Sequence, residues 1–123
     1  MKATSSQIVS FRNPVTPEAS TPDPKTLLSG EPQLTLWNHY TDPNNQFFAG
    51  VWSSTRGKWR ISYVEHEFCH MTRGRVRITN TGGEQWEFVA GDSFVVPGGF
   101  AGTWEVIEDC SKFYVIFQPS APT

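Results

Sequence analysis

The stretch from Gly57 to Pro97 constrains the fold more than any other part of the chain. It contains four short runs rich in Val, Ile, Phe, Tyr and Trp, separated by turns that contain glycine. The turns are T-R-G at 72–74, N-T-G-G-E at 80–84 and A-G-D at 90–92. Short strands with turn signals about every ten residues are typical of β sandwiches and barrels. The stretch therefore predicts an all-β fold.

Runs of the same kind flank this stretch and extend the predicted sheet. Leu34–Trp37 and Phe47–Ser54 precede it as strands, and Asn38–Asn45 between them has the Asn, Asp and Pro content of a loop. Gly50 marks a bulge or a close approach of two backbones. No segment has the period of a helix, so we expect about eight to ten strands. The other expected strands include 58–64, 102–108 and 112–117, the last two separated by a turn at 108–111.

Residues 1–33 differ from the rest of the chain in being rich in Pro, Ser and Thr. Proline removes a backbone donor and fixes φ, so this segment cannot be a central strand or a long helix. We interpret it as an arm that lies on the surface or on a partner subunit, with a disordered tail as the alternative. Ile8–Phe11 could still pair briefly as an edge strand. The predicted organisation is this arm, a barrel over residues 34–118 and a tail at 119–123.

Composition excludes several classes of partner. At 123 residues the chain is long enough for one domain with a substantial core. A formal charge of −2 does not favour binding to nucleic acid or to an anionic membrane. The sequence has neither the apolar core of a signal peptide nor an apolar run of membrane-spanning length. Its two cysteines make no disulfide framework, so we expect reduced thiols in a cytoplasmic protein.

Two spacings resemble the two conserved motifs of the cupin superfamily. Glu67 is followed by six residues and Gly74, and G-D at 91–92 is followed by P-G-G at 97–99. The resemblance is to the small single-domain branch related to ureidoglycine aminohydrolase and ethanolamine-utilisation cupins, and it covers about residues 34–118. It implies an RmlC-like jelly-roll barrel, a double-stranded β-helix. The matching residues are Trp52, Glu67, Cys69, Gly74, Gly91, Asp92, Pro97, Gly99, Trp104, Lys112 and Tyr114.

The positions that the resemblance assigns to metal ligands carry other residue types. The usual H-x-H pair falls at Arg60 and Ser62, and the usual second-motif histidine falls at Gly102. Only Glu67 remains, whereas a transition metal needs several N, O or S ligands that converge on it. An arginine beside Glu67 would also repel a cation. We therefore expect no metal and no other cofactor.

Glu67 determines which residues face the barrel interior, because side chains alternate between the two faces of a strand. If Glu67 points inward, as its motif position implies, Cys69 and Met71 also point inward. Phe68 and His70 then point outward. Counting along the preceding strand in the same way turns Arg60 and Ser62 inward, and the resemblance adds residues of the last two strands. The predicted interior set is Glu67, Cys69, Arg60, Ser62, Trp104, Lys112 and Tyr114.

This interior set is either a paired polar core or a ligand site. Buried charges need partners, so Glu67 should pair with Arg60 or Lys112. As a site, Glu67 would act as acid or base, while Arg60 and Lys112 would hold an anionic group. Cys69 beside these cations would be a nucleophile with a lowered pKa, or else a small buried hydrophobe. The candidate catalytic residues are then Glu67, Cys69 and Lys112, and the ligand-binding positions are Arg60, Ser62, Trp104 and Tyr114.

We therefore predict a small-molecule-binding cupin that takes a small polar or anionic metabolite without the usual metal, and leave open whether it is an enzyme. One alternative is a non-catalytic dimeric scaffold or regulatory module with a filled barrel. Another is a metal-dependent aminohydrolase or isomerase, although the ligands for it are missing. A homodimer is expected because a monomer rarely exposes a large apolar face. That outer face is expected to contain Trp59, Tyr63, Phe68 and Trp86, and the N-terminal arm is a second possible contact between the subunits. The alternative is that these aromatic residues pack in a second layer of the same sandwich.

Overall fold

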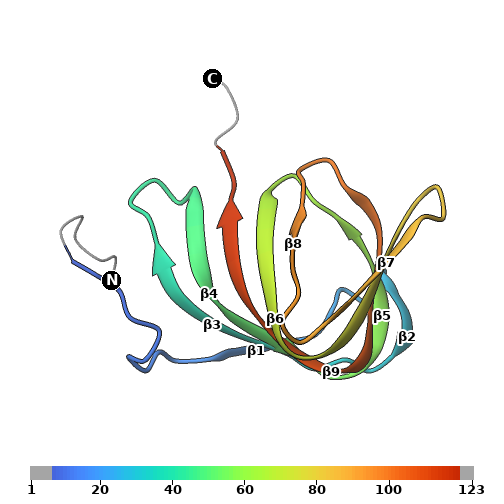
Figure 1. The fold of residues 1–123 in the computed structure, drawn as a ribbon, viewed down its shortest axis with the longest axis horizontal. Coiled ribbons are helices and arrows are strands. Elements are labelled where there is room, and N and C mark those ends of the chain that lie inside the picture. The colour runs from blue at the N-terminus through green and yellow to red at the C-terminus, as the bar shows by residue number, and fades with distance from the viewer. Residues whose placement is uncertain (1–6, 120–123) are drawn as a thin grey trace.

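The structure is a computed structural model that describes residues 7–119. Within this range it contains nine β-strands and no helix (Figure 1). No helix in this range is therefore long and apolar enough to cross a membrane. The all-β prediction is confirmed. The strands are β1 Glu18–Ser20, β2 Leu27–Gly30, β3 Leu34–Thr41, β4 Phe47–Ser54, β5 Gly57–Ser62, β6 His66–Asn80, β7 Gln85–Val89, β8 Ser93–Val96 and β9 Ala101–Phe117.

The strands form one antiparallel sheet that curls around an interior (Figure 1). Neighbouring strands follow the order β1-β3-β4-β9-β5-β2, and β6 pairs with β9, β7 and β8. The long strands β6 and β9 pair along most of their length. Each changes its other neighbour part-way along: β9 leaves β5 for β4, and β6 leaves β8 for β7. This exchange of partners bends one sheet into the jelly roll that was predicted.

Both long strands were predicted to be interrupted by turns, at 72–74 and at 108–111, and both predictions are wrong. The register between β6 and β9 shifts between Met71 and Val76, so the strands bend through bulges without losing their pairing. Gly74 lies in this bend with φ of 86°, a backbone conformation that glycine tolerates. Turn residues therefore mark a bend in these strands and not their end.

The predicted loop at 38–45 is also shorter than expected, because β3 continues to Thr41. The turn that follows is closed by the Asp42 carboxylate, which accepts hydrogen bonds from the backbone N–H of Gln46 and of Phe47. Gly50 in β4 lies where β3 shifts its register between Asn38 and Tyr40. A Cβ on Gly50 would overlap the carbonyl oxygen of Trp37, so the predicted close backbone approach is confirmed.

The proline-rich N-terminal segment lies along the edges of the barrel. β1 pairs with β3 and β2 pairs with β5, which makes these two short strands the ends of the main strand order. The predicted edge strand at Ile8–Phe11 is absent from the described residues. Phe11 instead stacks on His39, with 4.5 Å between the ring centroids. Residues 1–6 of the predicted arm lie outside the described residues.

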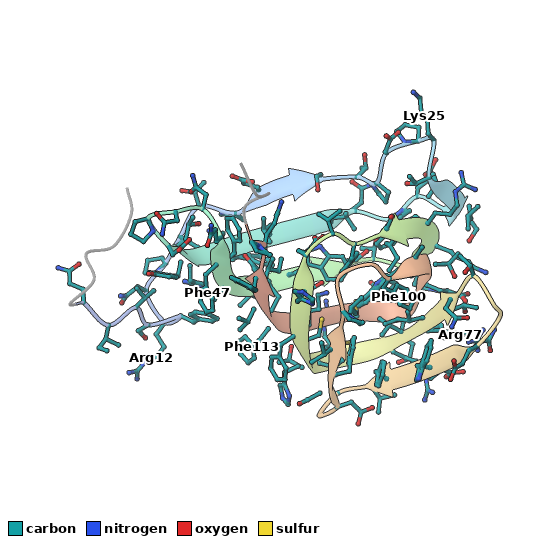
Figure 2. The ribbon with its side chains drawn as sticks, turned by 90° about the horizontal axis from the view of Figure 1, so that it is seen from above. Arg12, Lys25, Phe47, Arg77, Phe100 and Phe113 are labelled. Atoms are coloured by element: carbon teal, nitrogen blue, oxygen red, sulfur yellow. The ribbon has the colours of Figure 1, made fainter. Side chains whose placement is uncertain are left out.

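An apolar cluster fills part of the barrel, and its burial is the main source of stability in such a fold. Trp104 meets the ring of Trp52 edge-on at 5.8 Å, an arrangement that aromatic pairs favour. Side chains from the neighbouring strands crowd this interior in Figure 2. The buried members are Trp59, Met71, Val76, Ile78, Val96, Trp104, Val106 and Cys110.

Candidate functional site

The rest of the interior is a pocket of about 490 Å³ that opens to solvent. Its walls come from β1, β3, β4, β5, β6 and β9, and from the turn before β6. Most of the lining is aromatic or aliphatic, with a few polar and charged side chains. The lining residues are Glu18, Leu34, Leu36, Asn38, Thr41, Phe48, Trp52, Trp59, Ile61, Tyr63, Glu65, Glu67, Trp104, Lys112, Tyr114 and Ile116.

A buried ion pair between β6 and β9 forms part of this wall. The Lys112 Nζ lies 2.9 Å from the Glu67 Oε2, and the two side chains are only 4% and 6% exposed. The register of Glu67 is the predicted one, because Cys69 and Met71 are buried with it and Phe68 is 42% exposed. The inward positions of Lys112, Trp104 and Tyr114 are confirmed in the same way.

The ammonium group of Lys112 is held by more than Glu67. Its Nζ lies 4.7 Å from the ring centroid of Trp52 and 4.4 Å from that of Trp104, within cation–π range. Burial alone would lower the pKa of Lys112. The Glu67 carboxylate, and after it Cys69 and Tyr63, raise the pKa by more than burial lowers it, so the pKa of Lys112 lies above its ordinary value. Lys112 therefore stays charged at neutral pH. A permanently protonated lysine cannot serve as a nucleophile or a general base.

Cys69 does not have the lowered pKa that a nucleophilic thiolate needs. Burial raises the pKa of this thiol to about 12, although the nearby Lys112 opposes the rise. The Lys112 Nζ lies 3.4 Å from the Sγ. Tyr63 is also kept neutral: burial raises its pKa, Lys112 opposes this, and the hydrogen-bonded Glu67 raises it further. The raised pKa argues against a thiolate nucleophile, and the alternative, a small buried side chain, fits the environment.

Arg60 and Ser62 were predicted to point into the barrel, and this is wrong. Both are exposed on the outer face of β5, and the Arg60 guanidinium donates a hydrogen bond to the Lys25 carbonyl oxygen. The prediction extended the inward–outward alternation of β6 back into β5. A turn separates the two strands, so the alternation does not continue from one to the other. The residues of β5 and the turn after it that line the pocket are Trp59, Ile61 and Tyr63. Of the aromatics predicted for the outer face, Trp59 and Tyr63 are thus inside, while Phe68 and Trp86 are outside.

A short hydrogen-bond network forms another polar part of the pocket wall. The Tyr114 hydroxyl donates to the Asn38 Oδ1 at 2.6 Å, and the Asn38 Nδ2 donates to the Thr41 Oγ1 at 2.8 Å. Burial raises the pKa of Tyr114, with the Glu67 and then the Glu18 carboxylates adding to it. Sequence reasoning missed Asn38 and Thr41 because it assigned them to a loop. The alternation of Leu34, Leu36 and Asn38 was the available signal.

Two carboxylates near the solvent edge of the pocket were also missed. Glu18 belongs to β1, inside the segment interpreted as an arm, and pairs in register with Leu36 of β3. Glu65 lies in the turn before β6, where the sequence shows no motif. No local pattern assigns either residue to the pocket, because both reach it only through long-range strand pairing.

The donor set does not fit the divalent metal that the cupin resemblance implies. Across residues 7–119, no group of three or more His, Cys, Asp or Glu side chains is placed to hold an ion. The inward residues near Glu67 on β5 and its following turn are apolar or a neutral tyrosine, and its carboxylate is already bound to Lys112. A metal at Glu67 would have to displace that ammonium and would find too few other ligands.

Comparison with known proteins agrees with the fold. The EutQ-like cupin domain matches residues 41–114. A DUF861-family protein of unknown function from Pseudomonas syringae pv. tomato is 28% identical, with a TM-score of 0.76 over 88% of this chain and 46% of that one. The Clostridium difficile EutQ protein is 13% identical, with a TM-score of 0.64 over 72% of this chain and 65% of that one.

A putative ethanolamine utilization protein Q from Salmonella typhimurium is 17% identical, with a TM-score of 0.63 over 71% of both chains. The chain thus spans less than two thirds of the length of the Pseudomonas and Clostridium proteins. No curated protein matches it. The family match covers more than half of the chain, from β3 to β9. The chain therefore belongs to the EutQ-like cupin domain family.

Proposed function

We propose that this cupin domain binds a small organic molecule in the barrel pocket. The observation that carries the proposal is the open volume of about 490 Å³ beside a fully buried Lys112–Glu67 pair. Pockets for small ligands fall in this size range and combine apolar walls with a few polar groups. A scaffold with a filled barrel, the alternative, would have packed this volume with side chains.

We propose binding and not catalysis, because none of the three predicted catalytic side chains is activated. Lys112 and Glu67 neutralise each other at 2.9 Å. Burial raises the pKa of Cys69 to about 12, so the thiol is protonated at neutral pH. In this proposal Glu67, Cys69 and Lys112 form a rigid wall against which the ligand rests.

Filling the pocket should abolish binding. Leu36 lines the pocket, whereas its neighbour Thr35 lies on the other face of β3. Leu36→Trp should therefore remove the hits that a fragment library gives against the wild type in ligand-observed NMR. Thr35→Trp adds the same side chain outside and should keep them. The proposal fails if no fragment binds, or if the hits persist in Leu36→Trp.

A second proposal concerns the outer surface, where β4, β9, β6 and β8 present an outer apolar face that also contains His66 and His70. This face contains Phe47, Phe68, Val95, Phe113 and Phe117, each at least 40% exposed. Phe47 and Phe113 lie on the same side of the molecule (Figure 2). Phe68 lies between Val115 and Val95 in the register of the sheet. We propose that a second copy covers this face, because a monomer rarely leaves so large an apolar face exposed and a two-fold axis brings the same face of two copies together.

A charge on this face should prevent association. We expect light scattering to give twice the chain mass of 13.8 kDa for the wild type, and the chain mass for Val95→Glu. Leu28→Glu is the matched control, because Leu28 is another exposed apolar residue but lies on β2. A monomeric wild type at micromolar concentrations, or a dimeric Val95→Glu, would contradict the proposal.

A further inference from the structure

The charges that line the barrel pocket are unbalanced. Within residues 7–119, Lys112 is the one cation that lines the pocket, and Glu67 already neutralises it at 2.9 Å. Glu18 and Glu65 line the same pocket, and neither belongs to an ion pair within residues 7–119. The pocket therefore carries a net negative charge that comes from its outer part.

These two carboxylates lie where a ligand would pass or rest. Glu18 is exposed and Glu65 is half-buried, while the Glu67–Lys112 pair is deep. The Glu18 carboxylate is near enough to contribute to the raised pKa of the Tyr114 hydroxyl, which is part of the pocket wall. Arg60, which the sequence suggested as a partner for an anion, lies outside. Among the side chains of residues 7–119, an anionic ligand would meet two unpaired negative charges and no free positive one.

The aromatic walls of the pocket are suited to a cationic ligand. Lys112 lies over the rings of Trp52 and Trp104, and within the described residues no side-chain cation lies over Trp59 or Tyr63. Both of these rings line the pocket. Aromatic faces attract cations, and carboxylates nearby strengthen this preference.

We infer that the pocket is specific for an organic cation, an ammonium compound with an apolar or aromatic body. The inference rests on the proposed function, and it names the class of ligand. The ammonium group is directed toward Glu18 and Glu65, and the body lies along Trp59 and Tyr63.

Three probes of the same shape and different charge test this inference. They are 2-phenylethylamine, which is a cation at pH 7, the neutral 2-phenylethanol, and the anion phenylacetate. We expect titration followed by NMR to show the amine binding about tenfold more tightly than the alcohol, and the acid binding more weakly than both. The preference should shrink as salt is added, because exposed carboxylates are screened.

Charge variants locate the origin of this preference. In Glu18→Gln/Glu65→Gln the amine should lose most of its advantage, while binding of the alcohol stays unchanged. Glu31→Gln/Glu84→Gln is the matched control, since it removes the same net charge at exposed residues outside the pocket. It should keep the full preference for the amine.

Equal binding of amine and alcohol, a preference for the acid, or no binding of the amine would each overturn the inference. So would a preference that survives in Glu18→Gln/Glu65→Gln. In all these cases the proposed function still stands if fragments bind the wild type and Leu36→Trp removes them. A screen with no such fragment would instead overturn the proposed function itself.

Discussion

Replacing Lys112 by methionine is expected to lower the free energy of unfolding by about 3–5 kcal/mol, and Glu67→Gln by a similar amount. Both side chains are almost fully buried, and their 2.9 Å contact is what compensates the two charges. Removing one partner leaves the other group buried without compensation: the Glu67 carboxylate in Lys112→Met, or the Lys112 ammonium beside Trp52 and Trp104 in Glu67→Gln. Water at the outer part of the pocket does not reach the pair well enough to screen it.

The double variant Lys112→Met/Glu67→Gln should recover much of this loss, because it leaves no uncompensated charge. Urea unfolding of the wild type, both single variants and the double variant measures the coupling. Arg75→Met is the control for a surface pair. The Arg75 Nη1 lies 3.2 Å from the Glu87 Oε1, but both side chains are about 40% exposed, so a much smaller loss is expected. Small, additive losses at Lys112 and Glu67 would show that water screens the pair.

The sequence allowed the jelly roll and the inner faces of β6 and β9 to be predicted. Glu67 fixed the alternation along its own strand, and Cys69, Met71 and Phe68 lie on the expected faces. The same rule failed for β5 because a turn separates it from β6, and a turn resets the phase of the alternation. The local pattern was the better guide: Trp59, Ile61 and Tyr63 alternate with the polar Lys58, Arg60 and Ser62.

Other parts of the site could not be predicted from local sequence. Glu18 reaches the pocket because β1 pairs with β3, and a three-residue strand in a proline-rich segment has almost no signal of its own. The sequence left Arg60 and Lys112 as possible ion-pair partners of Glu67. The pairing of β9 with β6 identifies Lys112 as the partner. Whether the barrel is open depends on the sum of all inward side chains, which no single motif encodes.

The bend in β6 and β9 is the second place where one substitution should have a large effect. Gly74 has φ of 86°, and a Cβ there would overlap the carbonyl oxygen of Asp109 on β9. The left-handed conformation alone costs alanine about 1–2 kcal/mol, and overpacking of this kind adds about 1–3 kcal/mol. Since β6 and β9 are the two strands that join both halves of the barrel, Gly74→Ala should lower the free energy of unfolding by about 2–5 kcal/mol.

A Gly83→Ala variant distinguishes the cost of the left-handed backbone conformation from the cost of overpacking. Gly83 has nearly the same φ, 91°, but a Cβ there would have no atom within 4 Å. Its variant should therefore carry only the conformational cost of about 1–2 kcal/mol. Thermal or urea unfolding of both variants gives the difference, which measures how closely β6 and β9 approach at the bend. If Gly74→Ala cost no more than Gly83→Ala, the two backbones would have room to separate. The bend would then not be set by their contact.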